Sequence, residues 1–258
     1  MADSILDLGF SRLAVGTVQF GLPYGVANRV GQPSYREVRE ILACAMDNGV
    51  NTLDTAAAYG ESEEVVGRAL RELDAREQVI VITKVRHLTR MPEPRTRANV
   101  ERWIRDSVVS SLARLGLDSV PVCLFHNFND VAYMDILREL RDEGLVQHTG
   151  ASLSVPREMH PALSTPGVEA IETVANMLDP RIARGGEGAE GSALERAAAT
   201  GTAIFLRSIY LQGVLVMPEE EIMPELQAVL PVRRALAEIA GAAGLGMAEM
   251  ALRYGLSL

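Results

Sequence analysis

The sequence predicts an α/β protein of the (β/α)8 TIM-barrel type that is incomplete, with about seven β/α units and no visible eighth strand. Two observations support this fold class. Short apolar runs bounded by turn residues alternate with longer amphipathic segments, and the spacing between successive runs suits the right-handed crossovers of a parallel sheet. A chain of 258 residues with 48% hydrophobic content can bury one barrel-sized core, so residues 1–258 are expected to form a single domain.

Each element follows from its local pattern of apolar residues. Seven apolar runs are predicted as strands: Leu13–Thr17, Asn51–Asp54, Val79–Lys84, Val120–His126, Gln147–Ala151, Val168–Thr173 and Thr202–Leu206. The segments between them have helical spacing: Ser34–Asn48, Ser62–Leu73, Arg97–Leu115, Tyr133–Glu143, Pro156–Leu163 and Gly191–Thr200. Two further helices, Pro231–Ala243 and Met247–Leu256, follow the seventh strand.

The absence of an eighth strand has a consequence for the edges of the sheet. The first and seventh strands would present unpaired backbone groups, which favour aggregation unless they are covered. Either the sequence is a truncated piece of a longer chain, or the barrel is open or completed by a partner, with a homo-oligomer as one way to cover the edges. The Gly-rich segment Asp179–Ser192 is predicted to be a mobile loop on the active-site side.

Charge and hydropathy narrow the range of partners. A net charge of −9 and a pI near 5.1 argue against a nucleic-acid or anionic-membrane surface. No apolar run reaches the roughly 18 residues of a membrane span, and a cytoplasmic location is expected. His87, His148 and His160 lack metal-ligand spacing with cysteines or carboxylates, so no metal is expected. A small-molecule partner fits this composition best.

Lysine usage singles out one position. Of the 25 basic residues, Lys84 is the only lysine. Retaining one compact ammonium among so many guanidinium groups suggests that this position needs a point charge rather than a planar fork, although chance could also leave a single lysine.

Polar residues stand at the ends of three consecutive predicted strands. Asp54 closes the second strand, Lys84 the third and His126 the fourth, and Tyr59 follows Asp54 in the next loop. Because the carboxyl ends of parallel strands meet at one rim, these side chains are expected to converge. Taken singly, each has an ordinary structural explanation, but the four together favour a catalytic site.

The four groups suggest acid/base chemistry. A tyrosine beside an ammonium can act as a general acid, because the positive charge lowers its pKa from about 10. Asp54 is expected to hold Lys84 by an ion pair. His126 could orient a substrate carbonyl by donating a hydrogen bond.

The motifs that contain these residues resemble the aldo-keto reductases. They are GTVQFGLPYGVAN, GVNTLDTAAAYGESEEVVGRAL, VITK, LFH and GLVQHTGAS, and the resemblance runs from about Leu13 to Leu258. It implies a (β/α)8 barrel that uses NADP(H), with a catalytic tetrad of Asp54, Tyr59, Lys84 and His126. By this resemblance, Tyr59 donates a proton to a carbonyl that receives hydride from the nicotinamide, and the substrate is a small carbonyl compound or alcohol.

The resemblance also assigns the residues that contact the cofactor, and several of them differ from the family pattern. Ser152 is retained as a contact to the carboxamide, whereas Leu153 stands where the family has asparagine and Glu172 where it has glutamine. Arg207 takes the place of an aromatic residue that stacks on the nicotinamide, and it can stack its guanidinium plane or pair with a phosphate. The remaining cofactor candidates are Gly16, Thr17 and Ser208.

No binding site for the adenosine 2′-phosphate of the cofactor is recognisable in the sequence. In the family, the 2′-phosphate site follows strand eight, which would come after Leu258, and neither GxGxxG nor GxxxxGK[ST] is present. Three functions therefore stay open. The first is an NAD(P)H-dependent carbonyl reductase or alcohol dehydrogenase. The second is a nicotinamide-independent lyase, isomerase or cyclase that uses the same tetrad, and the third is a non-catalytic binding subunit.

Overall fold

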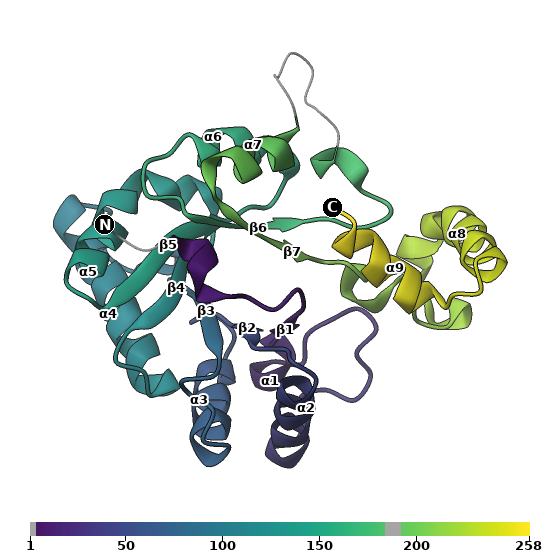
Figure 1. Cartoon of the computed structure of the whole chain (residues 1–258), viewed down its shortest axis with the longest axis horizontal. Helices are drawn as coiled ribbons and strands as arrows, with labels where there is room; N and C mark the ends of the chain where they lie inside the picture. The colour runs from purple at the N-terminus through teal and green to yellow at the C-terminus, as the bar shows by residue number, and fades with distance from the viewer. Residues whose placement is uncertain (1–3, 184–191) are drawn as a thin grey trace.

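Seven parallel strands form one sheet in the order of the chain, curled into a half-barrel with helices on its outer face (Figure 1). This architecture was obtained as a computed structural model, which describes residues 4–183 and 192–258. Most of the predicted loop Asp179–Ser192 lies outside the described residues. The parallel order and the outer helices confirm the predicted barrel type.

All seven predicted strands are confirmed, with ends shifted by one or two residues. They are β1 (Ala14–Gly16), β2 (Thr52–Asp54), β3 (Ile80–Lys84), β4 (Val120–Phe125), β5 (Val146–Ser152), β6 (Ala170–Val174) and β7 (Ala203–Arg207). No eighth strand pairs with β1 or β7 within residues 4–183 and 192–258. Self-association through these edges stays a prediction.

The predicted helices are confirmed as well. They are α2 (Tyr35–Asp47), α3 (Ser62–Glu72), α4 (Arg97–Leu115), α5 (Met134–Asp142), α6 (Met159–Leu163), α7 (Ala193–Thr200), α8 (Leu230–Ala242) and α9 (Met247–Leu256). Side-chain caps begin several of them: Ser34 and Glu37 form a capping box on α2, and Ser192 and Glu195 form one on α7. No single described helix is long and apolar enough to cross a membrane, although α8 with its preceding turn and α9 pass together as a bent pair by length and composition.

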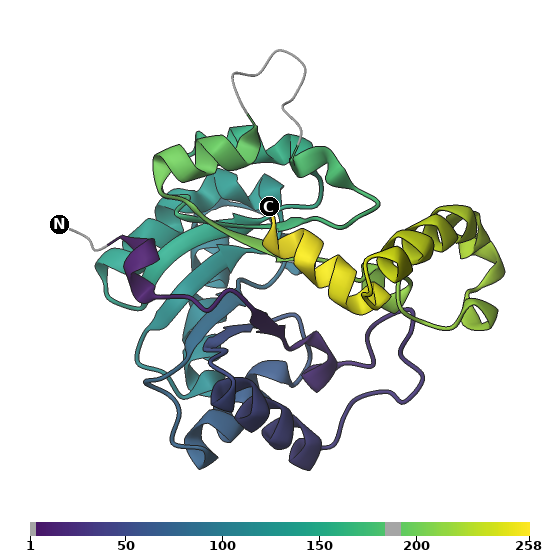
Figure 2. The same cartoon turned by 45° about the vertical axis from the view of Figure 1, so that its right-hand side comes forward.

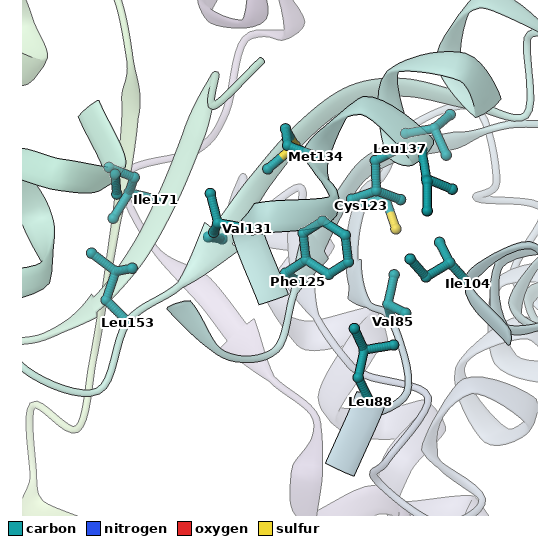
Figure 3. Packing of buried hydrophobic residues seen from close by; sticks show 14 of the residues in the cluster. Val85, Leu88, Ile104, Cys123, Phe125, Val131, Met134, Leu137, Leu153 and Ile171 are labelled. Atoms are coloured by element: carbon teal, nitrogen blue, oxygen red, sulfur yellow. The ribbon is translucent and has the colours of Figure 1, made fainter. Parts of the chain in front are cut away.

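The main core lies between the sheet and the helices that cover it. Phe125 and Cys123 on β4 pack there against Ile104 of α4 and Leu137 of α5, and all four side chains are buried (Figure 3). Leu153 belongs to the same apolar cluster and is fully buried. Outward-facing residues of β4 thus pack against the outer helices α4 and α5.

The inward face of the sheet has a second pattern. A smaller cluster that includes Ile82, Val122, Leu124 and Ala170 fills the lower part of the barrel. Because side chains alternate in a strand, the next inward positions lie two residues further along, and these are polar. They are Lys84, His126, Ser152 and Glu172. The sheet therefore carries a polar layer at its carboxyl end above an apolar floor.

Short helical turns were not predicted from the sequence. The 3-10 turn η1 (Ile5–Leu8) places Ile5 in the lower cluster inside the barrel, and α1 (Val18–Gly21) follows β1 directly. Three further 3-10 turns, η6 (Leu211–Gly213), η7 (Glu219–Glu221) and η8 (Pro224–Val229), connect β7 to α8. Such turns are too short to show an apolar period, so pattern reading misses them.

The open side of the barrel lies between β1 and β7. Helix α9 runs along this side while α8 projects away from the barrel (Figures 1 and 2). The Arg12 guanidinium donates a hydrogen bond of 2.6 Å to the carbonyl of Leu256, which ties α9 to the segment before β1. A largely apolar cavity of about 800 Å³ remains between these elements and extends to Asp54 and Glu172.

Candidate active site

The four predicted catalytic side chains meet at the carboxyl end of the sheet. Asp54 and Lys84 end β2 and β3, His126 directly follows β4, and Tyr59 lies in the loop after β2. The Lys84 ammonium lies 5.2 Å from the centre of the Tyr59 ring, and the ring centres of Tyr59 and His126 are 5.7 Å apart in an edge-to-face arrangement. The structure thus brings all four groups into one site.

Lys84 is fully buried, and three oxygen atoms surround its ammonium. Its Nζ lies 2.5 Å from Asp54 Oδ1, 2.9 Å from Glu172 Oε2 and 3.1 Å from the carbonyl oxygen of Thr55. The predicted ion pair with Asp54 is therefore present, and a second carboxylate shares the same ammonium. A buried charge requires such compensation, because unpaired burial is very costly.

Glu172 connects the tetrad to residues expected on the cofactor side. Its Oε1 accepts a hydrogen bond of 2.7 Å from the Ser152 hydroxyl and lies 3.1 Å from Arg207 Nε. Arg207 also donates through Nη2 to the carbonyl oxygen of Leu153, at 3.0 Å. Ser152, Glu172 and Arg207 thus form one network with Lys84, with Glu172 as its buried centre.

The two carboxylates differ in how firmly they hold their charge. Although burial alone would raise it, Lys84 and the Ser152 hydrogen bond lower the pKa of Glu172. Burial, followed by the negative charge of Glu172, raises the pKa of Asp54. Burial works against the ammonium of Lys84, but the two carboxylates outweigh it and raise the pKa of this lysine. Glu172 is the more strongly ionised partner because the Lys84 ammonium and the hydrogen bond from Ser152 both favour its charged form.

The environment of Tyr59 differs from the expectation in one respect. Burial raises the pKa of Tyr59 to about 12, although Lys84 acts in the opposite direction. The prediction that the ammonium would lower this pKa below its ordinary value is therefore wrong. The negative charges of Asp54 and Glu172 compensate the positive charge of Lys84, and both also disfavour a phenolate at Tyr59. Tyr59 is consequently held in its protonated form, as an acid.

His126 is held as a neutral ring. Burial, followed by Lys84, lowers its pKa to about 3, and its buried Nδ1 has no hydrogen-bond partner among the described residues. The ring of His87 stacks on it with a centroid distance of 4.1 Å and an interplanar angle of 23°. A neutral imidazole can orient a carbonyl by donating one hydrogen bond without supplying a charge.

Two glycines position the loop that carries Tyr59. A Cβ on Gly21 would lie 1.9 Å from the backbone oxygen of Tyr59, and Gly60 adopts a left-handed φ of +58° against the carbonyl of Gly21. Below this contact, the buried hydroxyl of Ser62 lies within hydrogen-bond distance of both Thr17 and Thr55. The motifs GLPYG and AYGES therefore supply the two glycines, Gly21 and Gly60, that let α1 pack closely on the Tyr59 loop.

The other cofactor candidates lie at the same rim. Gly16 ends β1 and Ser208 follows β7 with a left-handed φ of +62°, and both border the 800 Å³ cavity. The Thr17 hydroxyl is buried and donates to the carbonyl oxygen of Asp54 at 2.9 Å, which is a structural contact. Leu153 points into the core and does not line this cavity.

Sequence reasoning did not identify His87 and Asn127 as site residues. The Asn127 amide lies 2.9 Å from Nδ1 of His87, which holds the ring against His126. Both residues could have been found from their positions, since Asn127 directly follows His126 and His87 comes three residues after Lys84. Loops after barrel strands are where such enzymes place groups that contact substrates.

A parallel barrel with an acid/base cluster at the carboxyl ends of its strands is typical of β/α-barrel enzymes. Comparison with known proteins identifies the family. The model of the aldo/keto reductase family matches residues 12–258. The chain belongs to the aldo/keto reductase family, which is a family of oxidoreductases.

Individual relatives match over part of their length. The chain is 31% identical over 157 residues to the aldo-keto reductase YhdN of Bacillus subtilis, covering 58% of this chain and 46% of that protein. It is 30% identical over 177 residues to the NADH-specific methylglyoxal reductase of Escherichia coli, covering 57% and 49%. The matched segments thus span about half the length of these curated relatives.

Solved structures show the same fold. An aldo-keto reductase from Pseudomonas aeruginosa superposes with a TM-score of 0.59 and 30% identity, covering 76% of this chain and 72% of that chain. The glycerol dehydrogenase AKR11B4 from Gluconobacter oxydans superposes with a TM-score of 0.70 and 23% identity, covering 96% and 80%. The second likeness supports the fold alone.

Proposed function

We propose that this chain is the catalytic part of an NAD(P)H-dependent carbonyl reductase or alcohol dehydrogenase, with Tyr59 as the proton donor. One observation carries the proposal: Tyr59 and His126 face one another beside a fully enclosed Lys84 that is paired with Asp54. A barrel interior would not retain this polar cluster for packing alone, because buried ions rarely add stability.

Each residue then has a distinct task. Tyr59 donates its proton to the carbonyl oxygen of the substrate as that oxygen becomes an alkoxide, and Lys84 stabilises the resulting phenolate. His126 orients the carbonyl by a hydrogen bond from its neutral ring. Asp54 fixes the position of the Lys84 ammonium. Small carbonyl compounds or alcohols are the proposed substrates, and the proposed location is the cytoplasm.

The residues at the rim fit a nicotinamide. The 800 Å³ cavity has the size of a ligand pocket and borders Gly16, Glu172, Arg207 and Ser208. The Glu172 carboxylate can accept hydrogen bonds from a carboxamide, and Arg207 can stack on a ring or pair with a phosphate. The cofactor supplies the hydride when bound, while these side chains would hold and orient it.

A binding and turnover experiment tests the proposed function. The purified chain is titrated with NADPH and with NADH by calorimetry, and cofactor oxidation is then followed with a panel of aldehydes and ketones. Saturable binding and carbonyl-dependent oxidation are expected. Turnover of a carbonyl compound without any nicotinamide, still dependent on Tyr59 and Lys84, would overturn the proposal in favour of a lyase, isomerase or cyclase.

Replacement of Glu172 by glutamine is expected to change the pH dependence of this reaction. Removing one of the two negative charges beside Lys84 leaves more positive charge facing Tyr59, so the pKa of Tyr59 falls. Since reduction needs the protonated tyrosine, the alkaline decline of kcat should begin about one to two pH units lower in E172Q than in the wild type. The measurement is kcat for a carbonyl substrate as a function of pH.

Glu169→Gln provides a matched control. Glu169 also carries a half-buried carboxylate, pairs with Arg141 at 3.4 Å, and directly precedes the first residue of β6, whereas Glu172 lies within that strand. This variant should keep the wild-type pH profile. Equal alkaline declines in E172Q and the wild type would show that Glu172 does not control the acidity of Tyr59.

A further inference from the structure

A second, polar pocket is lined by His87, the residue whose ring stacks on His126. It has a volume of about 450 Å³ and is built by the loops that follow β3, β4 and β5. Its charged lining residues are Arg90, Arg95, Asp130 and Glu158. Loops at the carboxyl ends of barrel strands are the usual location of substrate contacts, so this pocket is placed to receive part of a substrate.

The acidic residues of the pocket are engaged by other protein groups. Glu158 Oε2 accepts hydrogen bonds from the backbone N–H groups of Ser154 at 2.8 Å and Val155 at 3.4 Å. Asp130 is only 5% exposed, and burial raises its pKa although Asn127, Leu88 and the charge of Arg95 act in the opposite direction. The carboxylate of Glu158 is thus bound to backbone groups and that of Asp130 is buried, so the two arginines are the most exposed charged groups of the pocket.

The two arginines of the pocket, Arg90 and Arg95, have no such partners in the described part of the chain. Within residues 4–183 and 192–258, neither Arg90 nor Arg95 forms an ion pair with a carboxylate. Their neighbours Arg97 and Arg102 each do, at 2.5 Å from Asp135 and Glu93 respectively. Free guanidinium groups that face a pocket are well suited to bidentate binding of a carboxylate or a phosphate.

His87 adds a hydrogen-bond donor at the boundary with the catalytic site. The Asn127 amide donates to Nδ1 of His87, and burial lowers the pKa of this histidine, so a neutral ring carries its proton on Nε2. The ring centres of His87 and His126 are 4.1 Å apart, so a group bound at His87 lies close to one bound at His126. A substrate whose carbonyl lies at His126 and whose charged group lies at His87 therefore needs only a short linker, of about two to four carbon atoms.

We propose that the pocket formed by His87, Arg90 and Arg95 binds an anionic substituent, a carboxylate or a phosphate, of the carbonyl substrate. The protein would then select anionic aldehydes or ketones over neutral ones of the same length. This inference rests on the proposed function for the reaction, but the binding of the anion itself does not require turnover.

Paired substrates test the selectivity. Succinic semialdehyde is compared with butyraldehyde, and glyceraldehyde 3-phosphate with glyceraldehyde, so that each pair differs in the charged group. The wild type should show a higher kcat/KM for the charged member of at least one pair, and the pair that responds identifies the anion as carboxylate or phosphate. R90Q/R95Q should reduce this advantage about tenfold, mainly through KM, with the neutral members changed less than about twofold.

The control variant is R36Q/R253Q. Arg36 and Arg253 form exposed ion pairs within α2 and α9, and neither lines the polar pocket, so the total charge changes equally without touching it. This variant should retain the selectivity of the wild type. A wild type that treats charged and neutral aldehydes alike, or identical behaviour of the two double variants, would overturn the inference while leaving carbonyl reduction intact.

Calorimetric titration with succinate and with inorganic phosphate gives a readout that is independent of turnover. Binding to the wild type and to R36Q/R253Q, but not to R90Q/R95Q, supports the anion pocket even if no carbonyl compound is reduced. Absence of binding by both anions to the wild type counts against it. Failure of the reduction assay alone instead rejects the proposed function.

Discussion

Tyr59→Phe is expected to lower kcat for carbonyl reduction at least about 100-fold, because the variant lacks the hydroxyl that donates the proton. The ring remains, so its edge-to-face contact with His126 and the packing of its loop should persist. Cofactor affinity and the thermal unfolding midpoint should therefore stay close to those of the wild type. The measurements are steady-state kinetics, cofactor titration and thermal unfolding on the same preparations.

Tyr133→Phe is the appropriate control for this substitution. Tyr133 packs against the main core near α5 and lies outside the candidate site, so loss of its hydroxyl should leave kcat unchanged. A Tyr59→Phe variant that retains full activity would exclude Tyr59 as the proton donor. Loss of activity together with unfolding would instead assign the residue a structural role.

Lys84→Met is expected to be the most destabilising of these substitutions. The ammonium is fully buried between Asp54 and Glu172, and its removal leaves two carboxylates inside the barrel without their shared cation. Breaking a buried ion pair from one side costs about 3–5 kcal/mol of folding free energy. Denaturant unfolding at neutral pH should show this loss, together with loss of activity.

Lys84→Met should also reverse the direction in which the ionisation of Glu172 changes the free energy of unfolding. In the wild type, the pKa of Glu172 is lowered, so its contribution is present above the ordinary carboxyl pKa of about 4.3 and is lost as the pH falls further. Without Lys84, burial dominates and the pKa is raised. The contribution is then largest in acid and lost as the pH rises, so the stability gap to the wild type should narrow between about pH 8 and pH 5.

Neutralising the carboxylates provides the control. A variant that combines Lys84→Met with Asp54→Asn and Glu172→Gln removes the charges that the lysine compensates, so it should recover most of the lost stability while remaining inactive. Without that recovery, the destabilisation would have to come from the altered shape of the side chain rather than from buried charge.

The barrel and its rim were predictable because they depend on short-range patterns. Apolar runs such as that ending at Lys84 have the length and residue types of buried strands, and parallel connection places their carboxyl ends together. The convergence of Asp54, Tyr59 and His126 follows from that geometry. Family resemblance then assigned their roles, and the structure is compatible with them.

The remaining features depend on contacts that no single segment contains. The pKa of Tyr59 was predicted with the wrong sign because burial of its side chain outweighs the effect of Lys84, and the charges of Asp54 and Glu172 add to the effect of burial. The stacking of His87 on His126 likewise joins two loops whose approach no local pattern reports. Leu153, which stands where the family has asparagine, turns its side chain to the core face of the sheet.

The burial of Lys84 also makes this protein unusual for chemical labelling. Its only side-chain amine is enclosed in the barrel and is held as an ammonium by two carboxylates. Acylating reagents need an accessible, unprotonated amine, so modification at Lys84 requires the sheet to open and the ion pairs to separate. The rate of acylation at this residue would therefore report local opening of the barrel, without interference from any other lysine.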